Sequence, residues 1–137
     1  MIVVTRLALL LAVISPADPF LQRWSERECG ADRVCKLGAD GERGPFQIKP
    51  AVWEGRRCEG DPWDWQDSAA CAAGYLDNLA GRQMCDDYPI AWGLAAYYDG
   101  IGDVLAYQRR EGCDLAGLPR HVYLYAAMGI PEPEGCY

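Results

Sequence analysis

A glutamate at position 28 and the glycine-rich segment that follows it are the residues of this chain best suited to chemistry. Leu21, Trp24 and Glu28 recur at spacings of three and four residues, so they share one face of a helix. Burial against apolar side chains raises the pKa of a carboxyl group, because burial disfavours the charged form. A protonated carboxyl group can donate its proton to the leaving oxygen of a glycosidic bond. Glu28 is therefore a candidate general acid, whereas Glu26 points elsewhere.

The segment 38–48 provides the second part of a candidate sugar site. It reads GADGERGPFQI, and its Gly44 follows Glu28 by sixteen residues. Glycines permit turn conformations and a close approach of the backbone to a neighbouring group. Gln47 carries both a donor and an acceptor for a sugar hydroxyl or amide. The order of these pieces predicts a chain that crosses beside the acid in a glycosidase cleft.

A second carboxylate is less sharply indicated. Asp40 and Glu42 lie in the crossing segment, and either could position a water molecule. Exposed carboxylates are also common in ordinary turns. The corresponding ordinary interpretation of Glu28 is a solvated residue paired with Arg27 or Lys36.

Aromatic residues could stack on the C–H faces of sugar rings. The candidates are Trp53, Trp63, Trp65, Tyr97, Tyr98 and Tyr107. Most buried aromatic residues are simply part of the core, and Trp24 and Trp92 are expected there. His121, the single histidine, is interpreted as a structural or surface residue.

The elements that must position these residues are mainly helical. Apolar spacing and capping signals predict helices over 19–29, 48–53, 67–79, 88–98, 102–110 and 118–128. The Asp18-Pro19 pair starts the first helix, Gly30 ends it, and Asp67-Ser68 caps the third. A loop or small β-hairpin is expected over 31–44. The predicted fold is a compact helical domain with this loop or hairpin as a small lobe.

The N-terminus has the pattern of a signal peptide. Arg6 precedes the eight-residue apolar core 7–14, and small residues follow at 15–17. The core is too short to span a bilayer, so no stable membrane insertion is expected. A buried N-terminal helix or strand is the alternative. We expect a signal peptide over 1–17, one domain over 18–137, and a secreted or periplasmic location.

Seven cysteines in a small exported chain of 137 residues predict disulfide bonds. A local Cys29–Cys35 bridge is one candidate pair, and Cys136 is the candidate for the odd cysteine, either free or paired between chains. A monomer is expected apart from such a link. No C-x-x-C pair and one histidine argue against a zinc site, and neither metal nor cofactor is expected. The net charge of −7 argues against nucleic acid as a partner.

The order of these motifs resembles the lysozyme-like superfamily, nearest to the soluble lytic transglycosylase domain. In that family a helix ends in a catalytic Glu, usually followed by Ser, and a Gly-x-x-Gln-apolar element comes next. A later helix carries Ala-Tyr-Asn-x-Gly-x-Gly-x-x-Val or a close variant. The corresponding stretches here are Glu28-Cys29, 44–48 and 94–104, with 121–124 similar to the closing Tyr-Val helix. The resemblance runs from about Phe20 to Met128.

The resemblance implies an α+β lysozyme-like fold, with the small lobe beside an active-site cleft, and an enzyme that cleaves peptidoglycan glycan strands. The bond would be the β-1,4 link between N-acetylmuramic acid and N-acetylglucosamine. Glu28 would be the single acid and base, and Phe46 and Gln47 would line the sugar site. Tyr97 would approach the glutamate, and Tyr98 would also bind substrate. The substrate's own 6-hydroxyl would complete the reaction and leave an anhydro-muramyl end.

Two departures from the family pattern keep alternatives open. Cys29 replaces the usual Ser, and Tyr98 replaces the usual Asn. The cysteine density and the stretch 46–49 resemble invertebrate-type lysozymes, which pair their Glu with an Asp about a dozen residues on. Asp40, twelve residues beyond Glu28, would then assist hydrolysis of the same bond. Further alternatives are an inactive lysozyme-like module that binds glycan or protein, and a disulfide-rich secreted protein whose motif matches are coincidental.

Overall fold

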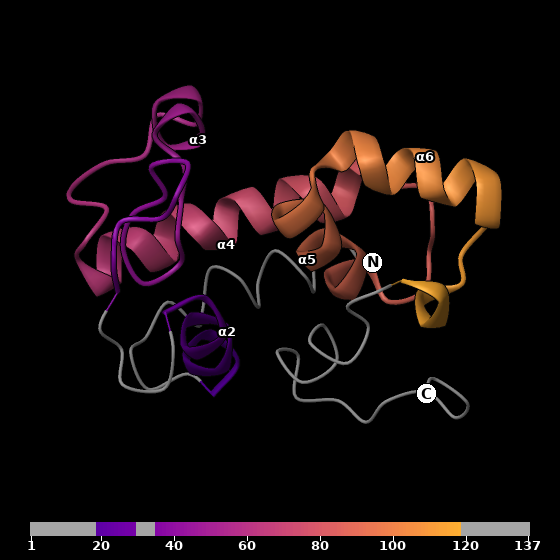
Figure 1. The fold of residues 1–137 in the computed structure, drawn as a ribbon, viewed down its shortest axis with the longest axis horizontal. Helices are drawn as coiled ribbons and strands as arrows, with labels where there is room; N and C mark the ends of the chain where they lie inside the picture. Colours follow the sequence, from indigo (N-terminus) through magenta and orange to yellow (C-terminus); the bar gives the residue numbers. More distant parts are fainter. Residues whose placement is uncertain (1–18, 30–34, 119–137) are drawn as a thin grey trace. The chain divides into compact units, whose positions relative to one another are not determined.

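The computed structural model describes residues 19–29 and 35–118, and this part of the chain is mainly helical (Figure 1). Its elements are α2 (Pro19–Cys29), α3 (Pro50–Gly55), α4 (Trp65–Arg82), α5 (Pro89–Asp99), α6 (Ile101–Glu111) and the 3₁₀ turn η1 (Leu115–Gly117). Five of the predicted helices are therefore present, and the mainly helical fold class is confirmed. The helix predicted over 118–128 and His121 lie outside the described residues.

The described chain forms two units, whose boundary falls inside α4 between Tyr75 and Leu76. The first unit contains α2, α3 and the first part of α4. The second contains the rest of α4, α5, α6 and η1. Within the described residues, no helix combines the length and apolar character needed to cross a membrane.

Three aromatic rings join the segments of the first unit. Leu21, Trp24 and Ser25 are the buried residues of α2, and they recur at helical spacing on one face. The Trp24 ring meets the Phe46 ring edge-on, with centroids 5.0 Å apart. Phe46 also contacts Trp65 at 5.1 Å, at the start of α4. Since Phe46 is fully buried, these contacts fix the segment that carries it.

The segment before α3 folds as two successive turns. The Gly41 N–H donates to the Gly38 carbonyl at 3.0 Å, which closes the first turn. Arg43 and Ile48 then form an isolated antiparallel bridge, with N–O distances of 3.1 Å in both directions. The Gly44–Gln47 stretch is the tip of this small hairpin, and the Gln47 N–H donates to the Gly44 carbonyl at 3.1 Å. The predicted loop or hairpin thus extends four residues further than its expected end at 44.

The start of α4 differs from the expectation. The sequence placed the cap at Asp67, but the helix begins at Trp65. The Asp64 carboxylate accepts the Asp67 N–H at 3.0 Å, which is the bond that an N-cap makes. The Asp67 carboxylate instead accepts the Asp61 N–H at 2.9 Å. Asp67 therefore braces the loop before the helix, and Asp64 caps the helix.

Three disulfides are present in the described residues, which confirms the disulfide prediction. They are Cys29–Cys35, Cys58–Cys71 and Cys85–Cys113, with Cα–Cα distances of 4.7, 5.6 and 5.7 Å. The first is the predicted local bridge. Three disulfides fit an oxidising extracellular or periplasmic environment. Cys136, the predicted odd cysteine, lies outside the described residues.

The second unit is built on two helices that meet at Gly100, which has a φ of +95°. In α5, Trp92 is fully buried, as predicted. A Cβ on Gly93 would lie 2.9 Å from Leu76 and 3.2 Å from the Ala80 Cβ. Gly93 therefore permits α5 to approach α4 closely, while α6 packs against α5 (Figure 1).

A glutamine pair links the end of α4 to α6. The Gln108 side chain is buried and donates to Gln83 Oε1 at 2.9 Å. Its own Oε1 accepts the Met84 N–H at 2.9 Å. Gln83 Oε1 also accepts the Cys85 N–H at 2.7 Å, next to the disulfide that joins Cys85 to Cys113. These bonds satisfy polar groups where α4 ends.

Candidate functional site

Glu28 lies in the last turn of α2 and is half-buried. It follows the buried Leu21, Trp24 and Ser25 by seven, four and three residues, so it extends their face of the helix. Glu26 lies two positions away, which is about 200° around the helix axis at 3.6 residues per turn. As predicted, one face of α2 carries Leu21, Trp24 and Glu28.

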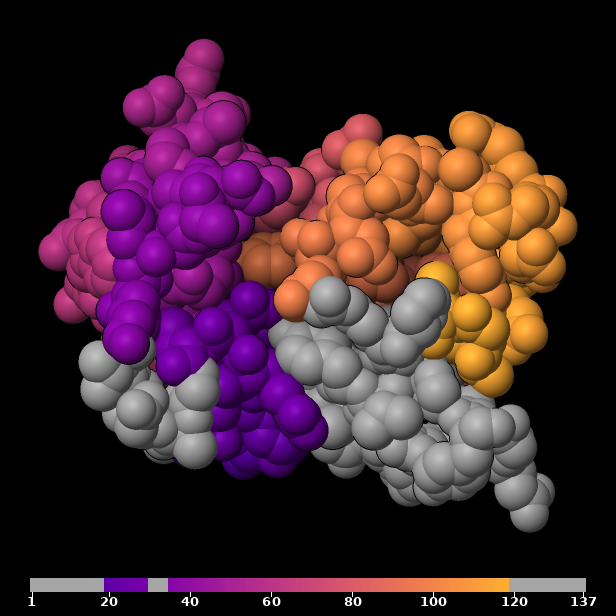
Figure 2. Space-filling model, in the orientation of Figure 1, coloured from indigo at the N-terminus to yellow at the C-terminus, as the bar shows by residue number. Residues whose placement is uncertain are grey.

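The tip of the hairpin lies against the end of α2. The Cys29 sulfur is 3.2 Å from the Gly44 carbonyl oxygen and 3.1 Å from the Pro45 carbonyl oxygen. Since this sulfur is part of a disulfide and carries no hydrogen, these are close S···O contacts and not hydrogen bonds. The space-filling view shows atoms of the loop against those of α2 (Figure 2). The crossing segment therefore passes directly beside the residue that follows Glu28.

Gly44 has a conformation and a position that only glycine suits. Its φ is +77°, a region that L side chains rarely adopt. A Cβ on Gly44 would collide with the Pro62 carbonyl oxygen and lie 3.3 Å from the Trp63 Cα. Gly44 thus contacts α2 through its carbonyl oxygen and the segment 62–63 through its Cα. The sequence predicted a close approach here, and the structure shows which two segments approach.

Gln47 uses its side-chain amino group to hold the hairpin. Its Nε2 donates to the Lys36 carbonyl and to the Gly44 carbonyl, both at 3.0 Å. Gln47 also has a φ of +50°, so both its backbone and its side chain are fixed by the loop. Its acceptor oxygen Oε1 is the half of the amide that a sugar N–H or O–H would use.

The other predicted residues of the first unit differ in exposure. Asp40 is exposed in the turn 38–41, where its N–H donates to Glu42 Oε2 at 3.2 Å. The Glu42 carboxylate occupies the space that a Cβ on Gly38 would need. Phe46 is fully buried between two tryptophan rings. Its side chain therefore positions the hairpin tip, and Asp40 presents its carboxylate to solvent.

Tyr97 and Tyr98 lie near the end of α5, in the second unit. Tyr97 is half-buried, and Tyr98 is 46% exposed. The structure therefore shows the hairpin tip that carries Gln47 against Cys29, the residue after Glu28, and Asp40 precedes this tip in the same loop. The approach of the two tyrosines to this site stays a prediction.

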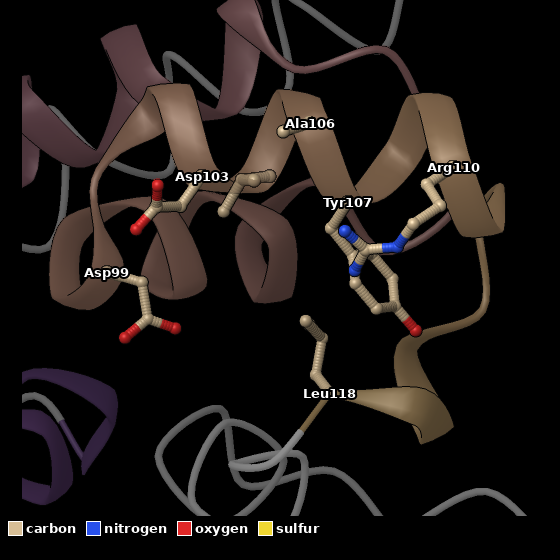
Figure 3. Close-up of a pocket in the computed structure, with 7 residues that line it drawn as sticks. Asp99, Asp103, Ala106, Tyr107, Arg110 and Leu118 are labelled. Atoms are coloured by element: carbon tan, nitrogen blue, oxygen red, sulfur yellow. The ribbon is translucent and has the colours of Figure 1, made fainter.

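The second unit holds a pocket that the sequence did not indicate. Its volume is about 300 Å³, and it is lined by Asp99, Asp103, Val104, Ala106, Tyr107, Arg110 and Leu118. Figure 3 shows the two aspartates toward one end and the Arg110 guanidinium beside the Tyr107 ring, 5.7 Å from its centroid. This pocket was not predictable from the sequence because its walls come from α5, α6 and the segment after η1.

Tyr107 should titrate above its ordinary value of 10.0. Burial raises the pKa of Tyr107, the carboxylates of Asp114 and Glu111 raise it further, and Arg110 lowers it. The folded state thus holds this proton more tightly than the unfolded chain. That adds stability below pH 10, which is lost as the pH rises through the folded pKa. We expect Asp114→Asn to move the pKa of Tyr107 back toward 10 in an NMR titration of its ring; an unchanged midpoint would contradict this cause.

No group of three or more His, Cys, Asp or Glu side chains in residues 19–29 and 35–118 is arranged to hold a metal ion. Comparisons with models of protein families, with curated proteins and with solved structures found no match for this chain. Its function is therefore inferred from the residues and their geometry.

Proposed function

We propose that this protein is a glycosidase that cleaves the β-1,4 bond between N-acetylmuramic acid and N-acetylglucosamine in peptidoglycan. The observation that carries the proposal is the contact between the Cys29 sulfur and the carbonyl oxygens of Gly44 and Pro45. Cys29, the residue that follows the half-buried Glu28, thus contacts a glycine-rich turn that carries the Gln47 amide. This is the arrangement in which a helix-borne acid can reach a bond in a sugar chain held by the turn.

In the proposed reaction Glu28 protonates the leaving glycosidic oxygen as the bond from the muramyl C1 breaks. The carboxylate that remains then accepts the proton of the muramyl 6-hydroxyl as this oxygen bonds to C1. The product is an anhydro-muramyl end, no water is consumed, and Glu28 regains its proton. This lytic transglycosylase outcome needs one carboxyl group, and that is the role proposed for Glu28.

The exposed position of Asp40 favours one second candidate. A carboxylate that faces solvent on the loop beside the acid could activate a water molecule. Water would then bond to C1 in place of the 6-hydroxyl, and the product would have a reducing end. In this lysozyme outcome, Asp40→Asn would lower turnover, whereas it would leave the transglycosylase reaction unchanged.

Mass spectrometry of the muropeptides released from purified peptidoglycan tests the proposal. Products lighter than hydrolytic ones by one water molecule would establish anhydro ends. Reducing ends would establish the lysozyme outcome and give Asp40 its role. Glycan binding without any product, in both the unchanged protein and Glu28→Gln, would contradict the enzymatic proposal and favour a binding module.

Gln47→Ala should affect both stability and substrate use. The loss of the two hydrogen bonds to Lys36 and Gly44 should lower the free energy of unfolding by about 1–3 kcal/mol. We expect peptidoglycan turnover at a temperature where the variant is fully folded to fall by more than the folded fraction explains. Denaturant titration and muropeptide release measure the two effects.

Gln47→Glu separates the two roles of this side chain. Glutamate keeps acceptor oxygens for the substrate but has no amino group for the carbonyls of Lys36 and Gly44. Gln47→Glu should therefore lower the free energy of unfolding by at least as much as Gln47→Ala does. An unchanged rate in Gln47→Ala, with only a lowered melting temperature, would show that Gln47 has no contact with substrate.

A further inference from the structure

Among the tryptophans of the described residues, Trp63 is the one that is exposed to solvent. Trp24 and Trp92 are fully buried, and Trp53 is 8% exposed. Trp65 is half-buried and packs on Phe46. Trp63 is 45% exposed, although a tryptophan side chain gains much from burial. An exposed indole ring of this kind is available for contact with a ligand.

The loop that carries Trp63 is held from several sides. The Trp63 N–H donates to Asp61 Oδ1 at 2.9 Å, and the Asp64 N–H donates to the Asp61 carbonyl at 3.0 Å. The Asp61 N–H is bound by Asp67 of α4 at 2.9 Å. The Cys58–Cys71 disulfide also joins this loop to α4. The ring is therefore presented from a fixed backbone, which reduces the entropy lost when a ligand binds.

The same loop touches the hairpin tip that lies beside the acid. A Cβ on Gly44 would lie 3.3 Å from the Trp63 Cα. The Gly44 carbonyl oxygen is 3.2 Å from the Cys29 sulfur. Three segments of the first unit are thus adjacent in the order Glu28-Cys29, Gly44-Pro45 and Pro62-Trp63. The backbone of Trp63 therefore borders the turn that forms the proposed site.

We propose that Trp63 is a stacking platform for an N-acetylhexosamine ring of the glycan strand, next to the sugar on which Glu28 acts. This inference rests on the proposed function. The apolar face of the indole matches the C–H face of a sugar ring. Asp61 and Asp64, exposed residues on either side of Trp63 in the same loop, carry carboxylate oxygens that can accept hydrogen bonds from sugar hydroxyls. This combination of an apolar face and surrounding acceptors favours a saccharide, and it needs no basic residue from a chain of net charge −7.

Binding of an N-acetylglucosamine tetramer tests this platform directly. Calorimetry in the Glu28→Gln background avoids cleavage of the probe. Trp63→Ala should raise the Kd roughly tenfold, within the range of one aromatic contact. Trp63→Tyr should recover most of the affinity because it keeps an aromatic face. The matched control is Leu37→Ala, since Leu37 is 66% exposed in the same unit and should leave the Kd unchanged.

Kinetics on peptidoglycan separate this proposal from the proposed function. Trp63→Ala should raise KM with little change in kcat, as expected for a contact equal in the ground and transition states. If it matches Leu37→Ala in both Kd and KM, the platform is overturned even where the protein cleaves peptidoglycan. Binding that depends on Trp63, without cleavage, would support the platform and overturn the glycosidase chemistry. The absence of both binding and cleavage in the unchanged protein would overturn both.

Discussion

Replacing Glu28 with glutamine should lower peptidoglycan turnover by about 10²- to 10⁴-fold, the contribution that general acid–base catalysis typically makes. Glutamine has nearly the same shape as glutamate and can still hydrogen bond, but it has no proton to transfer to a leaving oxygen. The loss should appear in kcat, with KM little changed, because proton transfer occurs only in the transition state. Quantified muropeptide release at saturating peptidoglycan measures this effect.

Glu26→Gln is the matched control on the same helix. Glu26 is also half-buried in α2, but two positions from Glu28 it projects on the opposite side of the helix. We expect the Glu26→Gln variant to turn over peptidoglycan at the same rate as the unchanged protein. Both variants should keep the melting temperature, because neither change removes a core side chain. Turnover that depends on Glu26 and not on Glu28 would overturn the helix-face argument.

Helix ends were predictable from the sequence where a local residue determines them. The start of α2 at Pro19 follows from the fixed φ of proline. The end of α5 at Asp99 follows from Gly100, whose φ of +95° is open to glycine. The start of α4 was not predictable in this way. Asp64 caps it from within a Trp-rich stretch that resembles a loop, and Asp67 turns back to Asp61.

The candidate site was predictable only in outline, because its details depend on residues far apart in the sequence. Glycine-rich composition and spacing indicated that segment 38–48 passes beside Glu28. They did not indicate that Phe46 packs against Trp65, or that the Gln47 amino group donates to the Lys36 carbonyl. The sequence also did not indicate that the segment 62–63 packs on Gly44. Each of these contacts joins segments whose relation appears only in the folded chain.

Gly44→Ala should be the most damaging small substitution in the hairpin. Alanine at a φ of +77° is strained by about 1–2 kcal/mol. The new methyl group would also collide with the Pro62 carbonyl, and such overpacking adds about 1–3 kcal/mol. The free energy of unfolding should therefore fall by about 2–5 kcal/mol in denaturant titration with the disulfides intact. Turnover should fall as well. The collision can be relieved only if the hairpin tip moves away from α2 or if the segment 62–63 moves away from the hairpin tip.

Gly41→Ala separates backbone strain from the collision. Gly41 lies in the same loop with a φ of +83°, but a Cβ there would meet only Pro50, at 3.8 Å. That is an ordinary van der Waals contact, so Gly41→Ala should show the conformational part alone, about 1–2 kcal/mol. The difference between the two variants then measures the packing of Pro62 on Gly44. If both variants lower the free energy of unfolding equally, the packing of Pro62 on Gly44 contributes nothing to stability. The proposed adjacency of α2, Gly44 and Trp63 would then lose its physical basis.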